Sequence, residues 1–180
     1  LGDVYKRQVH DIDLARPLDD ATVRWLEDAW TRHLVLVFPD QPISDAAHIA
    51  FARHFGALEI HPSLAHRARR HPEIYRVSNV DEDDHLIPPT DTGWQYLNQS
   101  WRWHSDSSFR PVPSKGSILH GIETTRDGGN TRFANLYAAY EALPAATRTR
   151  IDRMWVIHDH DHIVQHAPGL ANKIDQGSYD

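Results

Sequence analysis

The sequence predicts an α+β fold in which helices flank a sandwich or jelly roll of short β-strands. Three observations support this prediction: helical spacing of apolar residues before position 56, an unbroken apolar run at 34–38, and short strand-like segments separated by Gly and Pro turns after residue 100. Short strands with such turns are typical of sandwiches and jelly rolls. With 180 residues, 40% of them hydrophobic, the chain can bury a core as one domain.

The first part of the chain predicts one helix and one buried strand. Residues 1–8 are polar and show no period that joins them to the next segment, so we expect a leader or an assembly scar outside the fold. Either aspartate at positions 19–20 can cap a helix whose apolar residues recur at helical spacing, namely Val23, Leu26 and Trp30. The run at 34–38 is too short for a helix and predicts a central strand buried on both faces.

A second helix and strand are expected next, followed by a loop. Ser44 can cap a helix that runs through Phe55, and Gly56 is placed to end it in the left-handed conformation. Residues 74–80 have the pattern of a strand. Residues 81–92 combine acids and prolines, which is typical of a mobile surface loop, and such loops often act as lids beside a pocket.

The remaining segments predict short strands and one more helix. The expected strands cover residues 101–103, 116–122, 131–133 and 155–158. Pro111, Pro113 and the turn at 127–129 separate them. A helix is expected at 135–143 and on past Pro144.

Composition excludes several classes of protein. The formal charge is −6, from 25 acidic and 19 basic residues, and Lys and Arg form no continuous stripe, so we expect no nucleic-acid partner. The absence of cysteine excludes disulfide scaffolds, thiolate metal sites and cysteine nucleophiles. No apolar run approaches the ~20 residues of a membrane helix, so we expect a cytoplasmic protein without a membrane partner. A homo-oligomer is left open.

The pair His104 and Asp106 carries the chemistry. On a strand edge, a His-X-Asp spacing places the imidazole and the carboxylate on the same face, aimed at one point. Two histidines and one carboxylate can hold Fe(II) and leave three coordination positions open for a bidentate 2-oxo acid and dioxygen. In a chain with 14 histidines the spacing alone is weak evidence, because such pairs also arise by chance.

The motifs around this pair occur in a recognisable order. The pair is followed by Pro111-Val112-Pro113, then a strand-like segment at 116–122, then a glycine turn that leads to Thr131. This order closely resembles the taurine dioxygenase and 2,4-dichlorophenoxyacetate dioxygenase (TauD/TfdA) family of Fe(II)/2-oxoglutarate-dependent dioxygenases. Further likeness lies at 34–41, 55–62 and 138–143, so the resemblance runs from about Asp13 to His158. Ordered, separated motifs are a stronger signal than any one of them.

The resemblance implies a fold and a set of site residues. The fold would be a double-stranded β-helix (jelly roll, cupin-like) with flanking helices, and residues 9–180 would form the N-terminal and central part of a single dioxygenase domain. His104 and Asp106 would be catalytic iron ligands, and Thr131 would donate a hydrogen bond to 2-oxoglutarate. His61 and Phe109 would contact the substrate. Without the resemblance, each residue also has an interpretation that involves no ligand. Thr131 would be an ordinary strand residue, His61 a loop histidine and Phe109 an aromatic residue of the core.

The implied activity needs Fe(II), with 2-oxoglutarate and O2 as co-substrates. The family hydroxylates small anionic organic acids, either aryloxyalkanoate-like or sulfonate-like, and releases succinate and CO2. Leu64 departs from members that place a tyrosine there, which weakens the case for taurine. The third iron ligand, a distal histidine, and the arginine that pairs with 2-oxoglutarate are expected beyond residue 180. Nearer candidates for the third ligand are late histidines: His158, His160, His162 and His166.

Two alternatives remain open. A chain without the distal ligands would be a catalytically incomplete jelly-roll fragment that binds a metal or ligand without turnover. A cupin-like protein could instead use another divalent metal, zinc or manganese, held by His104, Asp106 and one late histidine.

Overall fold

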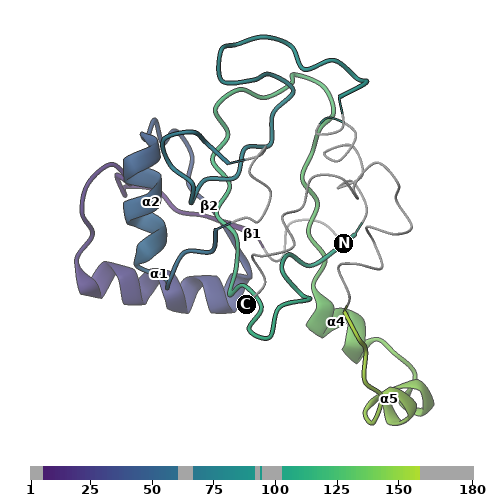
Figure 1. Cartoon of the computed structure of the whole chain (residues 1–180). Helices are drawn as coiled ribbons and strands as arrows, with labels where there is room; N and C mark the ends of the chain where they lie inside the picture. Colours follow the sequence, from purple (N-terminus) through teal and green to yellow (C-terminus); the bar gives the residue numbers. More distant parts are fainter. Residues whose placement is uncertain (1–5, 61–66, 92–93, 95–102, 159–180) are drawn as a thin grey trace. The chain divides into compact units, whose positions relative to one another are not determined.

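A computed structural model describes residues 6–60, 67–91, 94 and 103–158 (Figure 1). The chain divides into two compact units. The first unit comprises Leu1–Phe55 and Leu119–Val156, and the second comprises Gly56–Ile118 and Ile157–Asp180. Among the residues described, none of the helices has the length and apolar character needed to cross a bilayer.

Helix α1, Asp20–His33, confirms the first predicted helix. The Asp19 carboxylate caps it by accepting from the Thr22 N–H at 2.7 Å, and this hydrogen bond lowers the pKa of Asp19. Leu26 is fully buried, as helical spacing predicts. The helix ends at Leu34, whose backbone has a φ of +63° and whose N–H donates to the Trp30 carbonyl at 2.7 Å.

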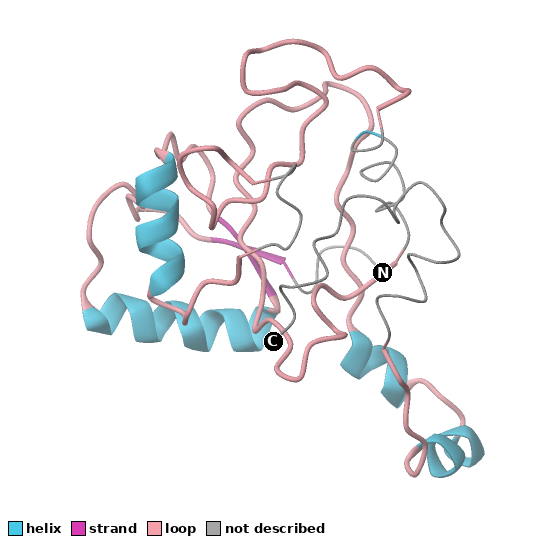
Figure 2. Ribbon diagram, viewed as in Figure 1, coloured by secondary structure: helices cyan, strands magenta, loops and turns pink. Residues whose placement is uncertain are grey.

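In the described residues the sheet has two strands, which are parallel and lie in the first unit (Figure 2). Strand β2, Val35–Val37, pairs with β1, Lys6–Gln8, in the register Lys6 to Val35. Residues 6–8 therefore belong to the fold, whereas the sequence placed them outside it. The strand predicted at 34–38 is shorter than expected and only half-buried, because β1 is its only partner among the described residues.

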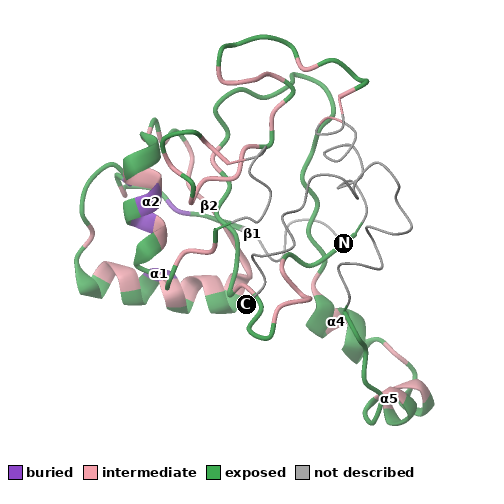
Figure 3. Cartoon of the chain, in the orientation of Figure 1, coloured by how far each residue is buried: buried purple, intermediate pink, exposed green. Residues whose placement is uncertain are grey.

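Helix α2, Asp45–Arg53, confirms the second predicted helix, and Ser44 caps it by accepting from the Ala47 N–H at 3.2 Å. Gly56 follows with a φ of +149°, a backbone angle that L side chains rarely adopt. The buried positions of α2 contribute to the core of the first unit (Figure 3). That core comprises Val9, Leu14, Leu26 and Phe51, with Ile12, Leu18, Leu36, Phe38, Ile43 and Phe55 packed against it.

Edge-to-face aromatic contacts hold α2 in this core. The ring centroids of Phe51 lie 5.5 Å from Phe38 and 5.2 Å from Phe55, and Trp30 lies 6.0 Å from Phe55. Each such pair adds roughly 0.5–1.5 kcal/mol beyond the burial of the rings. These rings come from α1, from α2 and from the residues that follow β2 and α2, so they link these segments within the core of the first unit.

The third predicted helix is broken in two. Helix α4, Leu136–Glu141, begins at Asn135, whose side chain accepts from the Ala138 N–H at 3.1 Å, and α5 covers Ala145–Ile151. The sequence predicted one helix through Pro144. Pro144 instead begins α5, because a proline lacks the N–H that a continuous helix would need at that position.

The strands predicted after residue 56 do not form in the part of the chain that is described. Residues 74–80 contribute only isolated bridges, Arg67 with Tyr75 and Val80 with Leu86. Residues 103, 116–122, 131–133 and 155–158 are loops, and residues 101–102 lie outside the described range. A strand requires a partner for its backbone groups, and local sequence does not supply one. Their apolar side chains are accordingly exposed: Trp103, Ile118, Leu119, Ile122, Phe133, Trp155, Val156 and Ile157.

Candidate metal site

His104 and Asp106 lie together in the second unit. The Nε2 atom of His104 is 3.3 Å from Oδ1 of Asp106, and the two side chains are 53% and 58% exposed. An octahedral divalent ion with donor bonds of about 2.1 Å places neighbouring donors about 3 Å apart. The separation and the nitrogen and oxygen donors therefore fit two ligands of one ion, and their exposure leaves room for water or a ligand.

Ser117 orients the other oxygen of the Asp106 carboxylate. Its hydroxyl donates to Oδ2 at 2.7 Å, so one oxygen of Asp106 faces His104 and the other is held by Ser117. Outer partners of this kind fix the direction of a metal-binding carboxylate. Sequence reasoning missed Ser117, because it stood only as one residue of an expected strand.

The loop between these residues is tightly turned. Ser107 follows Asp106 with a φ of +52°, and its carbonyl accepts from the Arg110 N–H at 3.1 Å. A non-glycine residue in the left-handed region is uncommon and is held only where surrounding contacts fix it. Glu59 supplies such contacts to this loop, and nothing in the sequence singles it out.

His158 lies against the same loop. Its Nδ1 atom is 2.9 Å from the hydroxyl of Ser108, two residues after Asp106. The other late histidines, His160, His162 and His166, lie outside the described residues. Within the described ranges, no group of three or more His, Cys, Asp or Glu side chains could hold a metal ion. The third ligand is thus not assigned.

Three other residues were predicted to bind the substrate or the co-substrate: Phe109, His61 and Thr131. Phe109 is half-buried in the same loop. His61, like Leu64, lies outside the described residues. Thr131 is exposed in the first unit, after a turn in which Gly128 and Gly129 have φ values of +77° and +66°. The binding roles of these three residues remain predictions.

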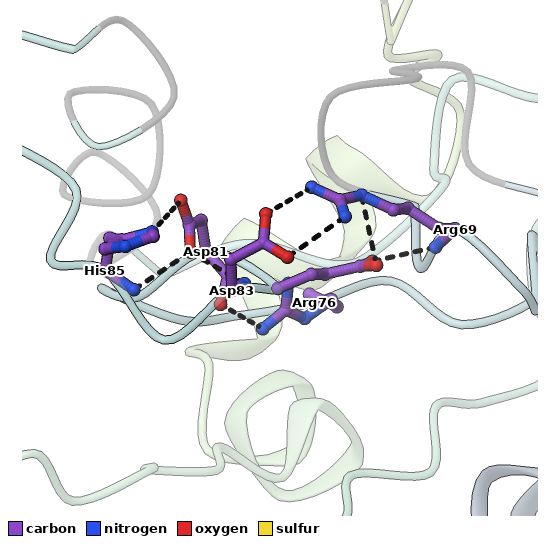
Figure 4. A network of polar contacts seen from close by, with 6 residues as sticks. Arg69, Arg76, Asp81, Asp83 and His85 are labelled. Carbon is purple, nitrogen blue, oxygen red and sulfur yellow. Dashed lines mark hydrogen bonds and ion pairs between the residues drawn. The ribbon is translucent and has the colours of Figure 1, made fainter.

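Residues 67–87 of the second unit, expected in part to be a mobile loop, carry an ionic network (Figure 4). Arg69 makes two hydrogen bonds to the Asp83 carboxylate, at 2.9 and 3.3 Å, which raise the pKa of Arg69. Asp81 accepts from the N–H groups of His85, at 2.9 Å, and Asp83, at 2.8 Å, and these bonds lower its pKa. Arg76 donates to the Asp81 carbonyl at 3.2 Å. The carboxylates of Asp81, Glu82 and Asp83 are thus engaged by protein groups.

Comparison with known proteins adds a family match. Residues 2–177 match the model of the family described as "Taurine catabolism dioxygenase TauD, TfdA family". The chain is 34% identical over 164 residues to an (S)-phenoxypropionate/alpha-ketoglutarate-dioxygenase from Sphingobium herbicidovorans, covering 90% of the chain and 53% of that protein. It is 33% identical over 163 residues to an alpha-ketoglutarate-dependent 2,4-dichlorophenoxyacetate dioxygenase from Cupriavidus pinatubonensis, covering 88% of the chain and 56% of that protein.

A third relative acts on another class of acid, and solved structures share the fold. The chain is 30% identical over 156 residues to an alpha-ketoglutarate-dependent sulfate ester dioxygenase from Pseudomonas putida, covering 86% of the chain and 46% of that protein. The crystal structure of AAD-2 in complex with Mn(II) and N-oxalylglycine matches with a TM-score of 0.66 and 33% identity, covering 82% of the chain and 51% of AAD-2. A taurine dioxygenase from Burkholderia xenovorans matches with a TM-score of 0.65 and 29% identity, covering 83% of the chain and 49% of that structure. The chain spans about half the length of the curated relatives it matches.

Proposed function

Because the chain belongs to the taurine dioxygenase TauD, TfdA family, we propose that it is the iron-binding part of an Fe(II)/2-oxoglutarate-dependent dioxygenase that hydroxylates a small anionic organic acid. The observation that carries this proposal is the contact of 3.3 Å between His104 and Asp106. An iron site made of two histidines and one carboxylate needs an imidazole nitrogen and a carboxylate oxygen at about this separation, and these two residues supply both donors.

Each predicted residue has a role in this proposal. His104 and Asp106 would hold the iron, while Ser117 would keep the Asp106 carboxylate in position. Thr131 would donate its hydroxyl to a carboxylate of 2-oxoglutarate. Bound iron, with 2-oxoglutarate and O2, would supply the oxidation that yields succinate and CO2 and hydroxylates the substrate. Two residues would contact the substrate. Phe109 would form an apolar wall, and His61 would donate a hydrogen bond to the anionic group.

The proposed substrate class is an aryloxyalkanoate. Two relatives are named for phenoxypropionate and 2,4-dichlorophenoxyacetate, and a third is named for sulfate esters. All of these are small organic anions. An aromatic wall at Phe109 suits an aryl ring, and Leu64 stands where some taurine-type members place a tyrosine. A sulfonate or a sulfate ester is the second candidate substrate class. An assay in which compounds of the two classes compete for turnover would decide between them.

The proposed fold is a jelly roll with flanking helices, of which this chain carries part. The structural neighbours are dioxygenases of this family, and the chain covers about half of each. In the described residues the expected strands are loops with exposed apolar side chains, such as Ile122 and Phe133, 84% and 66% exposed. We expect these segments to be strands that pair with other parts of the intact protein.

The test is an anaerobic titration of the intact protein with Fe(II) and 2-oxoglutarate. A 2-oxo acid chelated to Fe(II) gives a weak visible charge-transfer band, which should appear with the wild type and be lost in His104→Ala. His85→Ala is a matched control, because His85 is also an exposed histidine of the second unit and contacts Asp81 instead. A folded protein without the band would contradict the proposal. Binding of zinc or manganese that depends on His104, with turnover that needs no 2-oxoglutarate, would favour the cupin-like alternative.

A further inference from the structure

One side chain, Glu59, contacts three residues of the segment that follows the metal pair. The Ser107 hydroxyl lies 2.8 Å from each oxygen of the Glu59 carboxylate. The Ser114 hydroxyl donates to Oε2 of Glu59, and Nε of Arg110 lies 3.0 Å from Oε1. All four residues belong to the second unit, and the contacts span 48 to 55 positions of the chain.

These contacts lie in a partly dry environment. The side chains of Glu59 and Arg110 are 30% and 25% exposed, so water screens their charges less than at an open surface. Hydroxyl groups that donate to an ionised carboxylate form stronger hydrogen bonds than neutral pairs. The Arg110 Nε finds no hydrogen-bond partner among the described residues, so its contact with Glu59 is an ion pair without hydrogen-bond geometry.

The contact with Ser107 controls a strained backbone. Ser107 has a φ of +52° and comes directly after Asp106. The conformation of Ser107 sets the direction in which the chain leaves Asp106, and hence whether Ser117, further along the chain, can reach and hold the Asp106 carboxylate. A serine stays in this region only when its surroundings hold it there. The Glu59 carboxylate holds it, because both of its oxygens lie within hydrogen-bond distance of the Ser107 hydroxyl.

We propose that Glu59 is a positioning residue for the metal pair: its carboxylate holds Ser107, Arg110 and Ser114, and so fixes the Asp106 carboxylate beside His104. This inference rests on the proposed function, since it concerns the geometry of the same site. Glu59 also stands two positions before His61 in the sequence, so it ties the segment predicted to contact the substrate to the loop predicted to bind the metal.

The first experiment measures the affinity of the intact protein for Mn(II) alone, by electron paramagnetic resonance of the free ion. Loss of an outer partner weakens metal binding by 10- to 100-fold, so we expect Glu59→Ala to weaken Mn(II) binding about tenfold. The Mn(II) affinity of Glu59→Gln should lie between those of Glu59→Ala and the wild type, because the amide oxygen can still accept a hydrogen bond from a serine. Thermal melts of each variant establish that it is folded, and Glu59→Gln carries the comparison if Glu59→Ala does not fold.

Glu82→Ala is the matched control. Glu82 is a carboxylate of the second unit that is 24% exposed and paired with Arg69 and Arg76, so its removal also takes a carboxylate away from arginine partners. Both ion pairs lie within residues 67–87, away from the Ser107 turn in sequence. We expect its Mn(II) affinity to stay within about twofold of the wild type, since the ion pairs of Glu82 join residues 67–87 to one another and not to the Ser107 turn.

A second variant tests the route through Ser107. Glycine adopts positive φ without strain, so Ser107→Gly makes the observed turn accessible without Glu59. The double variant Glu59→Ala with Ser107→Gly should therefore bind Mn(II) more tightly than Glu59→Ala alone. A merely structural loss would instead become worse with the second substitution.

The controls separate two kinds of failure. His104→Ala and Asp106→Ala must each weaken Mn(II) binding, and if neither does, the proposed function itself is wrong. If both do, but Glu59→Ala matches Glu82→Ala or Ser107→Gly restores nothing, the positioning role of Glu59 is overturned. Tenfold weaker binding with recovery in the double variant supports it.

Discussion

At the scale of single residues, the two oxygens of the Asp106 carboxylate are held by different neighbours. Oδ1 faces His104 at 3.3 Å and Oδ2 accepts from Ser117 at 2.7 Å. The sequence could predict the first contact, because the two residues are separated by one position. It could not predict the second, because the partner of a side chain across a turn depends on how the chain folds back.

Ser117→Ala is expected to weaken divalent metal binding about tenfold, because it frees the Asp106 carboxylate to rotate away from His104. Calorimetric titration of Mn(II) into the intact protein measures the change. Ser117→Thr keeps a hydroxyl at the same position and should retain most of the affinity. Equal losses in the two variants would show that the hydroxyl is not what matters.

The ionic network of residues 67–87 predicts that the stability of this segment depends on pH. Backbone N–H groups of His85 and Asp83 lower the pKa of Asp81 below its ordinary value of 3.8. A carboxyl with a depressed folded-state pKa contributes stability above its unfolded pKa and loses it as the pH falls through the lower, folded value. The rate of amide hydrogen exchange in residues 81–85, divided by the intrinsic rate at the same pH, should thus rise below about pH 4. In Asp81→Asn these amides should exchange fast already at neutral pH. Exchange in the wild type that shows no such acceleration would contradict this assignment.

At the scale of elements, local sequence predicted where the helices begin and the caps at Asp19 and Ser44, but the break at Pro144 and the pairings that need a distant partner were missed. The caps at Asp19, Ser44 and Asn135 each lie within three residues of the N–H they bind, and the helices begin where expected. Strand β1 was missed because its polar residues show no pattern, and only its pairing with β2 makes it a strand. The predicted strands after residue 100 have the right apolar residues, but the described part of the chain gives them no neighbour to pair with.

Gln41 joins two segments of the first unit, and its loss should destabilise that unit. Its side-chain oxygen accepts from the Leu14 N–H at 3.0 Å, and its nitrogen donates to the carbonyls of Ile12 and Pro39 at 2.9 and 3.2 Å. Removing a partner from part-buried backbone groups costs about 1–3 kcal/mol. Chemical denaturation of Gln41→Ala should show a loss of this size, and Gln41→Glu, which keeps the acceptor, should still lose stability. Wild-type stability in both would contradict the role of Gln41.

The glycine turn before Thr131 offers a second test at this scale. Gly128 and Gly129 both have positive φ, and a Cβ at Gly129 would approach the Thr125 hydroxyl to 3.1 Å. Alanine at either position should cost roughly 1–2 kcal/mol of unfolding free energy, because an L side chain disfavours this conformation. Gly121→Ala is the control in the same unit, since its Cβ would make only an ordinary contact of 3.5 Å with Thr124. Equal effects at Gly121 and Gly129 would rule out backbone strain as the cause.

At the scale of the whole molecule, the buried core of the described residues is concentrated in one part of the sequence. The core residues Val9, Leu14, Leu26 and Phe51 all come from the first 55 positions. Further along the described chain, large apolar side chains are exposed instead, with Trp155 at 95% and Ile157 at 90%. Exposed apolar surface of this kind marks an interface or a liability for aggregation. We expect these residues to be covered by other parts of the jelly roll in the intact protein.

The 180-residue chain on its own should therefore unfold without a sharp cooperative transition and should bind the hydrophobic dye ANS. A cooperative transition requires one contiguous core, whereas here the core of the first unit is small and residues 116–122 and 131–133 lack paired strands among the described residues. Calorimetry and ANS fluorescence of this chain, compared with the intact protein, measure both effects. The intact protein should melt sharply and bind little dye, because the proposed pairing of these segments would bury Ile122 and Phe133 and satisfy their backbone groups together. A sharp melt of the 180-residue chain alone would show that its exposed segments need no partner, and would contradict the proposal that they are strands of an incomplete jelly roll.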